Sequence, residues 1–176
     1  MALVHCHFFS QTLGRMTALS ALLPEPGQDC DPPDEPVRYP TLYLLHGLSD
    51  DHTVWLRRTS LERYLEGRRL AVVLPAAGRS FYTDALRGQR YWSFVSEELP
   101  RLARHLFPLS ARREENFAAG LSMGGYGAFK LALAHPERFA AAASLSGALD
   151  VARLVEEEQA AGTSELQDIF GPAERL

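Results

Sequence analysis

Clusters of positive charge are absent from this sequence. Its 176 residues carry 18 Lys and Arg against 22 Asp and Glu, which gives a net charge of −4. Nucleic acids and anionic membranes attract proteins through basic patches, so neither is an expected partner. Long apolar runs are absent as well, because no stretch reaches the roughly 18 residues that a membrane-spanning helix needs. We therefore expect a globular protein with one domain over residues 1–176.

Cysteine is scarce, and the sequence lacks a signal for export. Cys6 and Cys30 lie far apart and form no CxxC or Cys/His spacing that would predict a metal site. We interpret them as free thiols in a reducing compartment. The first segment, residues 1–16, has no basic n-region, so it does not resemble a signal peptide. A cytoplasmic protein without a bound metal is expected.

The most informative motif is Gly120-Leu121-Ser122-Met123-Gly124, a G-x-S-x-G pentapeptide. A short apolar run precedes it, and a segment with a helical composition follows, ending before Pro136. A serine on a tight strand-to-helix turn projects its hydroxyl clear of the sheet, and the flanking glycines relieve crowding. Ser122 is therefore the predicted nucleophile.

Histidine is missing where a serine hydrolase of this type requires it. On such a scaffold the acid and the histidine follow the serine along the chain. After Ser122 the only histidine is His135, at the end of the helix that Ser122 opens. We expect the acid and the base to lie beyond Leu176, and this chain alone to be nearly inactive.

Short apolar runs alternate with helix-like segments, which predicts an α/β sheet with helices on both faces. Expected strands cover residues 3–10, 15–23, 42–45, 70–74, 117–119 and 140–145, and expected helices cover 53–66, 91–107 and 124–135. The first two strands form an antiparallel hairpin at Gly14, and the others suit parallel strands buried on both faces. A Pro- and Asp-rich stretch, residues 24–36, is expected to be a surface loop.

The carboxyl ends of parallel strands meet at one edge of the sheet, where ligands bind. Four segments end there: residues 46–49, residues 75–79, Ser122, and residues 146–147. An oxyanion formed by attack of Ser122 needs preorganised N–H donors. The backbone N–H of Met123 is one expected donor, and that of Leu48, after Gly47, is the other. Taken alone, His46-Gly47 also fits a simple turn at the end of a strand.

Five segments in this order resemble the esterase D group of α/β-hydrolases, which includes acetyl esterases and S-formylglutathione hydrolases. They are residues 45–49, 55–59, 81–84, 96–100 and 119–127. The resemblance covers most of the chain from Tyr39 onward. It implies an α/β-hydrolase fold that lacks its last strand–helix units. It also implies a carboxylesterase that acts on short acyl esters or thioesters without a cofactor.

By the same resemblance, Ser122 is the nucleophile and the N–H groups of Leu48 and Met123 form the oxyanion hole. His46, Gly47, Trp55 and Tyr82 are expected at the substrate pocket, although Trp55 fits a core aromatic equally well. Asp84 and Asp150 are weaker site candidates, since each follows the end of a strand. Four histidines lie on expected strands or helices and are interpreted as structural: His5, His7, His105 and His135.

Two functions from different classes remain open. The first is a serine esterase, or an acyltransferase in which a second alcohol replaces water. The second is a non-catalytic α/β-hydrolase-like scaffold, which the missing histidine favours and the retained elbow disfavours. The apolar strand at 140–145 is expected to leave an unpaired edge, so self-association into a homo-oligomer is also open.

Overall fold

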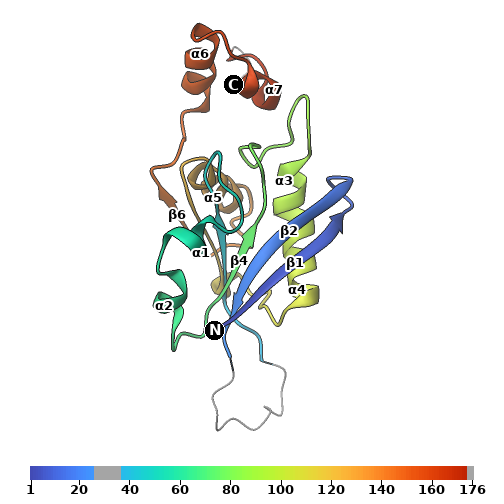
Figure 1. The fold of residues 1–176 in the computed structure, drawn as a ribbon, viewed down its shortest axis with the longest axis vertical. Helices are drawn as coiled ribbons and strands as arrows, with labels where there is room; N and C mark the ends of the chain where they lie inside the picture. The colour runs from blue at the N-terminus through green and yellow to red at the C-terminus, as the bar shows by residue number, and fades with distance from the viewer. Residues whose placement is uncertain (26–36, 174–176) are drawn as a thin grey trace.

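A twisted six-stranded sheet forms the centre of the molecule (Figure 1). The computed structural model describes residues 1–25 and 37–173. The strand order is β1-β2-β4-β3-β5-β6; β4, β3, β5 and β6 run parallel, and β1–β2 is an antiparallel hairpin that joins β4. This arrangement confirms the predicted α/β class with a mostly parallel sheet.

The strands lie where the apolar runs predict them, within one or two residues at most ends. Their bounds are β1 Ala2–Ser10, β2 Arg15–Leu23, β3 Thr41–Leu45, β4 Ala71–Pro75, β5 Asn116–Leu121 and β6 Ala141–Leu145. Most of the Pro- and Asp-rich stretch, together with Cys30, lies outside the described residues. Cys6 on β1 has no disulfide partner within the described part of the chain.

Two of the three predicted helices are interrupted. The segment expected at 53–66 forms α1 (Val54–Arg58) and α2 (Leu61–Leu65). Thr59 between them is extended, its hydroxyl donates to the Trp55 carbonyl, and it accepts from Leu61 N–H. Threonine hydroxyls compete with the helical hydrogen bonds in this way, which ends α1 early.

The segment expected at 91–107 is α3 (Tyr91–Ser93), a π-helical turn (Phe94–Glu98) and α4 (Leu99–Leu106). Pro100 has no N–H to donate to the Ser96 carbonyl. The side chain of Arg138 donates to that carbonyl instead. The wider π-helical turn thus lies just before a proline that cannot supply the ordinary i+4 hydrogen bond.

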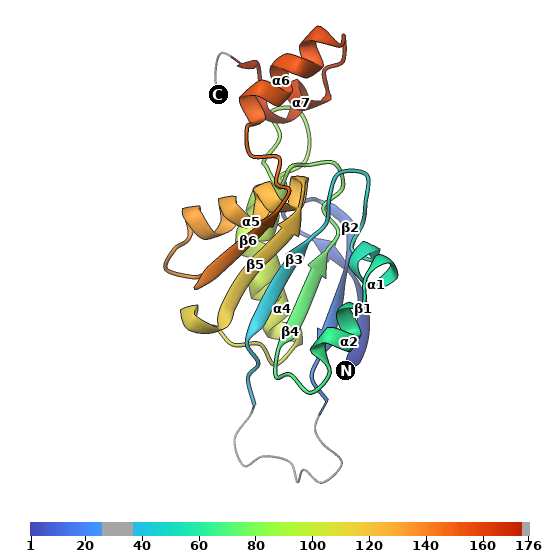
Figure 2. The same cartoon turned by 90° about the vertical axis from the view of Figure 1, so that its left-hand side faces the viewer.

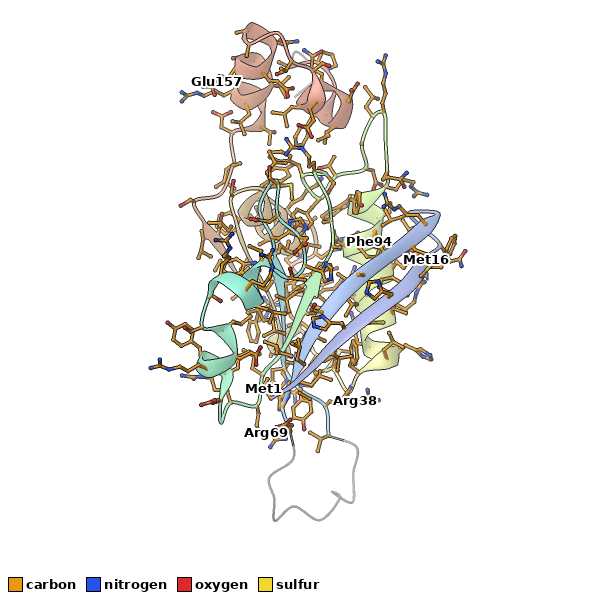
Figure 3. All side chains as sticks on the ribbon, in the orientation of Figure 1. Met1, Met16, Arg38, Arg69, Phe94 and Glu157 are labelled. Carbon is orange, nitrogen blue, oxygen red and sulfur yellow. The ribbon has the colours of Figure 1, made fainter. Side chains whose placement is uncertain are left out.

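Helices cover both faces of the sheet (Figure 2). On one face, α1 and α2 pack over a small apolar cluster that includes Leu44, Leu65 and Val72. On the other face, α4 and α5 (Met123–Ala134) cover the larger core, which includes Tyr43 and Phe94. Phe94 stacks on Phe8 of β1 with 6.3 Å between ring centres and lies beside the hairpin in Figure 3.

Two further helices, for which the sequence made no prediction, stand beyond the carboxyl edge of the sheet in both views (Figures 1 and 2). They are α6 (Val151–Ala160) and α7 (Glu165–Phe170). Asp150 caps α6 by accepting a hydrogen bond from Arg153 N–H at 3.1 Å, so its role is structural. We call residues 151–170 the cap segment.

On the α1 side, the sheet surface at β5 and β6 is incompletely covered. Leu121 and Leu145 are register partners, and they are 39% and 44% exposed. Within the described residues, β6 pairs only with β5, so its outer edge is free. Free apolar edges favour association, so self-association remains a prediction. None of the described helices is both long and apolar enough to cross a membrane.

Candidate active site

Ser122 sits in a strained turn between β5 and α5. Its backbone has φ 54° and ψ −116°, a combination that non-glycine residues rarely adopt. The surrounding backbone fixes this geometry, because Ser122 N–H donates to the Leu145 carbonyl at 2.9 Å. The Ser122 carbonyl in turn accepts from Tyr126 and Ala148. Strain held in place this way is typical of functional sites.

The turn can be this tight only because glycines flank it. A Cβ on Gly120 would contact the backbone of Gly124, and a Cβ on Gly124 would lie 2.7 Å from the His46 carbonyl oxygen. Real Cβ atoms do not approach backbone that closely. The first turn of α5 is therefore pressed directly against the end of β3.

The loop after β3 (residues 46–53, the β3–α1 loop) lies beside Ser122. A Cβ on Gly47 would lie 3.9 Å from the Cβ of Ser122 and 3.4 Å from the Leu121 carbonyl oxygen. Among the described residues, neither the N–H of Leu48 nor that of Met123 donates to a backbone carbonyl. The hydroxyl of Ser122 also makes no hydrogen bond to a described residue. Two N–H groups without a backbone acceptor and a serine hydroxyl without a hydrogen bond therefore lie at this edge of the sheet.

His46 anchors that loop and does not line an open pocket, which corrects the sequence expectation. Its side chain is buried, with Nδ1 2.8 Å from the Gly47 carbonyl and Nε2 3.0 Å from Ala77 N–H. A carbonyl can only accept and an N–H can only donate, so Nδ1 carries the proton and Nε2 accepts. Burial lowers the pKa of His46, which keeps the ring neutral.

Replacing His46 with Phe should therefore destabilise the protein. The ring volume is roughly kept, but Ala77 N–H and the Gly47 carbonyl both lose their partner, at a cost of about 2 kcal/mol. Urea unfolding followed by circular dichroism measures this change. The wild-type free energy of unfolding should also fall as pH drops below about 6.5, since the unfolded ring protonates first. Equal stability of H46F and the wild type would show that these hydrogen bonds contribute nothing.

Tyr82 and Trp55 also lie behind the site. Tyr82 is fully buried, and its hydroxyl donates to the His46 carbonyl at 2.9 Å. Its ring packs where a side chain on Gly127 would have to be. Trp55 donates from Nε1 to the Leu45 carbonyl at 3.1 Å and packs in the cluster under α1. This position of Trp55 agrees with the interpretation of Trp55 as a core aromatic. Tyr82 supports the β3–α1 loop through its hydrogen bond to the His46 carbonyl.

Backbone strain is concentrated at the same edge. Among the described residues, every non-glycine residue with positive φ follows one of the parallel strands. They are Ser49 after β3, Phe81 and Tyr82 after β4, Ser122 after β5 and Ser146 after β6. Strained residues that gather at one edge, away from the core, indicate that this edge is the functional one.

None of the six histidines is hydrogen-bonded to Ser122. His135 stacks on Trp92 at the far end of α5, and His5 contacts Ser20 on the hairpin. Asp84 accepts from Ser93 N–H and Ser93 hydroxyl, at 2.9 and 2.6 Å, so it holds the start of α3. Within the described residues, no histidine or carboxylate is in hydrogen-bond contact with Ser122, and the position of the acid and the base stays a prediction.

A cavity of about 400 Å³ opens on the hairpin side of the β3–α1 loop. Ser122 and Met123 do not line it. Its polar lining comes from His7, Arg15, Asp50, Asp51, His52 and Tyr91. The described residues contain no cluster of three or more side chains able to hold a metal ion.

Lys130 on α5 is a residue that the sequence did not single out. Its ammonium donates to the Thr83 hydroxyl at 2.7 Å and lies 4.7 Å from the centre of the Trp92 ring. Burial lowers its pKa to about 8. A lysine in an apolar helix gives no sequence signal for such a contact, because Thr83 is 47 residues away.

Comparisons with known proteins identify the family of this chain. A family model described as "Putative esterase" matches residues 10–172. An acetyl esterase from Caldicellulosiruptor saccharolyticus is 33% identical over 157 residues, covering 88% of this chain and 59% of that protein. The chain thus spans less than two thirds of that relative.

Two solved structures from Staphylococcus aureus have the same fold. The fluorophosphonate-binding serine hydrolase FphF is 37% identical with a TM-score of 0.85, over 97% of this chain and 66% of that one. The S-formylglutathione hydrolase FrmB is 33% identical with a TM-score of 0.78, over 99% and 73%. The fold is that of the α/β serine hydrolases, and the match over residues 10–172 shows that this chain belongs to the putative esterase family.

Proposed function

We propose that this protein is a serine carboxylesterase that cleaves short-chain acyl esters or thioesters through an acyl-enzyme on Ser122. The observation that carries the proposal is the strained Ser122 turn, whose hydroxyl makes no hydrogen bond to a described residue and which lies next to Gly47 of the β3–α1 loop. The N–H groups of Leu48 and Met123, which donate to no backbone carbonyl, are the proposed oxyanion donors. The acetyl esterase and S-formylglutathione hydrolase relatives support the same class of reaction.

In the proposed reaction, the oxygen of Ser122 attacks the acyl carbonyl carbon. The two N–H groups stabilise the oxyanion, and each such donor typically contributes about 10²- to 10³-fold in rate. The C–O or C–S bond then breaks, and the alcohol or thiol leaves with a proton. Water, or a second alcohol in the transferase alternative, releases the acyl group from Ser122.

Proton transfer in both steps requires a general base that the described residues do not supply. We propose that the acid and the histidine lie outside these 176 residues. Loss of a triad member typically lowers kcat by about 10⁶, so steady turnover by this chain alone should be very slow. An ester with a good leaving group releases an anion that needs no proton, so its acylation step depends less on the base than deacylation does and remains accessible, at a reduced rate.

The chain should therefore react with p-nitrophenyl acetate to release about one equivalent of p-nitrophenolate and then nearly stop. Deacylation needs the same missing base, so the acetyl group stays on the enzyme. Absorbance of p-nitrophenolate against time measures the burst. Acetate and butyrate esters should react faster than the decanoate ester if the acyl pocket is short.

Ser122→Ala should remove the burst, whereas Ser146→Ala should keep it. Ser146 is a matched control, since it is also a serine with positive φ, at 47°, at the end of the neighbouring strand. A burst that survives in Ser122→Ala would contradict the proposal. Absence of a burst in the folded wild type would favour the non-catalytic scaffold instead.

A further inference from the structure

Arg79 joins three segments at the functional edge of the sheet. It lies in the loop after β4 and binds Glu165 of α7 through a two-pronged contact, with Nε–Oε1 at 2.5 Å and Nη2–Oε2 at 2.6 Å. Its third nitrogen, Nη1, donates to the Ser49 hydroxyl at 2.8 Å. One guanidinium thus connects the cap segment to the β3–α1 loop.

The point of contact on the β3–α1 loop is close to the site. Ser49 directly follows Leu48, whose N–H is the second oxyanion donor of the proposed function. Ser49 also has a positive φ of 71°. A contact that holds its side chain therefore acts on a strained backbone one residue from the donor.

The cap segment is attached to the β4 side by other contacts as well. Leu86 N–H donates to the Ile169 carbonyl at 3.0 Å, and Arg87 N–H donates to the Asp168 carbonyl at 2.8 Å. The ring of Phe170 packs edge-on against Phe81 with 5.4 Å between centres. None of these contacts reaches the β3–α1 loop, whereas Arg79 reaches it through the Ser49 hydroxyl.

We propose that Arg79 is a positioning residue that couples the cap segment to the β3–α1 loop, so that a seated cap segment holds the Leu48 N–H toward Ser122. This inference rests on the proposed function, which assigns the Leu48 N–H the role of an oxyanion donor. The coupling itself is a property of the fold and can be measured without any ester. Displacement of the cap segment, by contrast, would release Ser49 and loosen the donor.

The chemistry of arginine suits this role. Its planar fork binds both carboxylate oxygens of Glu165 and still presents a nitrogen to Ser49, which the single ammonium of a lysine cannot do. The side chains of Arg79 and Glu165 are 48% and 41% exposed, so the ion pair is partly screened by solvent. We therefore expect the coupling to change amide exchange by about two- to fivefold.

Hydrogen exchange of single backbone amides, followed by NMR on the intact chain, tests the coupling. Within the β3–α1 loop, Asp50 N–H donates to the Gly47 carbonyl at 3.2 Å and so closes a turn around Leu48 and Ser49. Glu165→Gln should raise exchange at the Asp50 amide about two- to fivefold. Reciprocally, Ser49→Ala should raise exchange across residues 165–170, since coupling acts in both directions. Arg79→Lys should produce both effects while keeping the positive charge.

The matched control is an ion pair within the cap segment that does not touch the loop. Arg153 Nε and Glu157 Oε1 are 2.7 Å apart on α6, and Glu157 lies far from the sheet in Figure 3. Glu157→Gln should leave exchange at the Asp50 amide unchanged. The proposal is overturned if Glu165→Gln changes exchange only within the cap segment, or if Glu157→Gln changes exchange at Asp50 equally. A failed p-nitrophenyl acetate burst would count against the proposed function but would not alter this result.

Discussion

Replacing Gly124 with Ala should destabilise the protein by about 3 kcal/mol or more. The added Cβ would lie 2.7 Å from the His46 carbonyl oxygen and would press on the Leu45 carbonyl. Both are backbone atoms at the end of a buried strand, so they cannot move as a flexible side chain could. This expected destabilisation is opposite to the usual effect, because Gly→Ala inside a helix otherwise stabilises a protein by about 0.5–1 kcal/mol.

Urea unfolding compares G124A with the wild type, and Gly67→Ala is the control. A Cβ on Gly67 meets nothing within 4 Å, although its φ is +70°. Gly67→Ala should therefore lower the free energy of unfolding only by the conformational cost of a positive φ, about 1–2 kcal/mol. The burst of p-nitrophenolate should disappear in G124A even where the protein remains folded, since the clash moves the elbow away from the β3–α1 loop. Equal stability of G124A and the wild type would show that Gly124 does not lie this close to the carbonyl oxygens of Leu45 and His46.

Replacing Glu98 with Ala should cost about 3 kcal/mol of folding free energy. Glu98 is buried at the end of the π-helical turn. It accepts hydrogen bonds from Ser10 hydroxyl, Gln11 N–H and Thr12 N–H at 2.6, 2.8 and 3.0 Å. Its removal leaves the donors of the β1–β2 turn without a partner. Thermal unfolding should show the loss as a lower melting temperature.

The Glu98 carboxylate should also make stability depend on pH. Burial alone would raise its pKa, but the hydrogen bonds from Ser10, Thr12 and Gln11 outweigh burial and hold its pKa below the ordinary value. The stabilisation is therefore present above the pKa of the unfolded chain, about 4.3, and is lost as pH falls through the folded pKa. Glu98→Gln should flatten the stability curve below about pH 5. Glu62→Gln, at an exposed residue without such hydrogen bonds, should leave the curve unchanged.

The strands and the strand-to-helix turn at Ser122 could be predicted because their signals are local. An apolar run of four to six residues between turn residues specifies a buried strand, and the spacing of Gly120, Ser122 and Gly124 specifies the elbow. The π-helical turn and the break at Thr59 could not be predicted, because each depends on which partner a carbonyl or hydroxyl finds in the folded chain.

Side-chain roles that depend on residues far apart in the sequence could not be predicted either. The turn chemistry places His46 and Tyr82 at the functional edge, but only packing decides that both face inward. Arg79 and Glu165 are 86 residues apart, and no periodicity connects them. The sequence therefore predicts which edge carries the chemistry, whereas the supports of that edge become visible only in the fold.

The proposed esterase function depends most directly on Ser122 acting as the nucleophile. The decisive measurement is peptide mass spectrometry of the folded chain after reaction with p-nitrophenyl acetate. We predict one acetyl group, on the peptide that contains Ser122, and none on that peptide in Ser122→Ala. Acetylation only at Lys130 or other side chains, with Ser122 unmodified, would contradict the central claim.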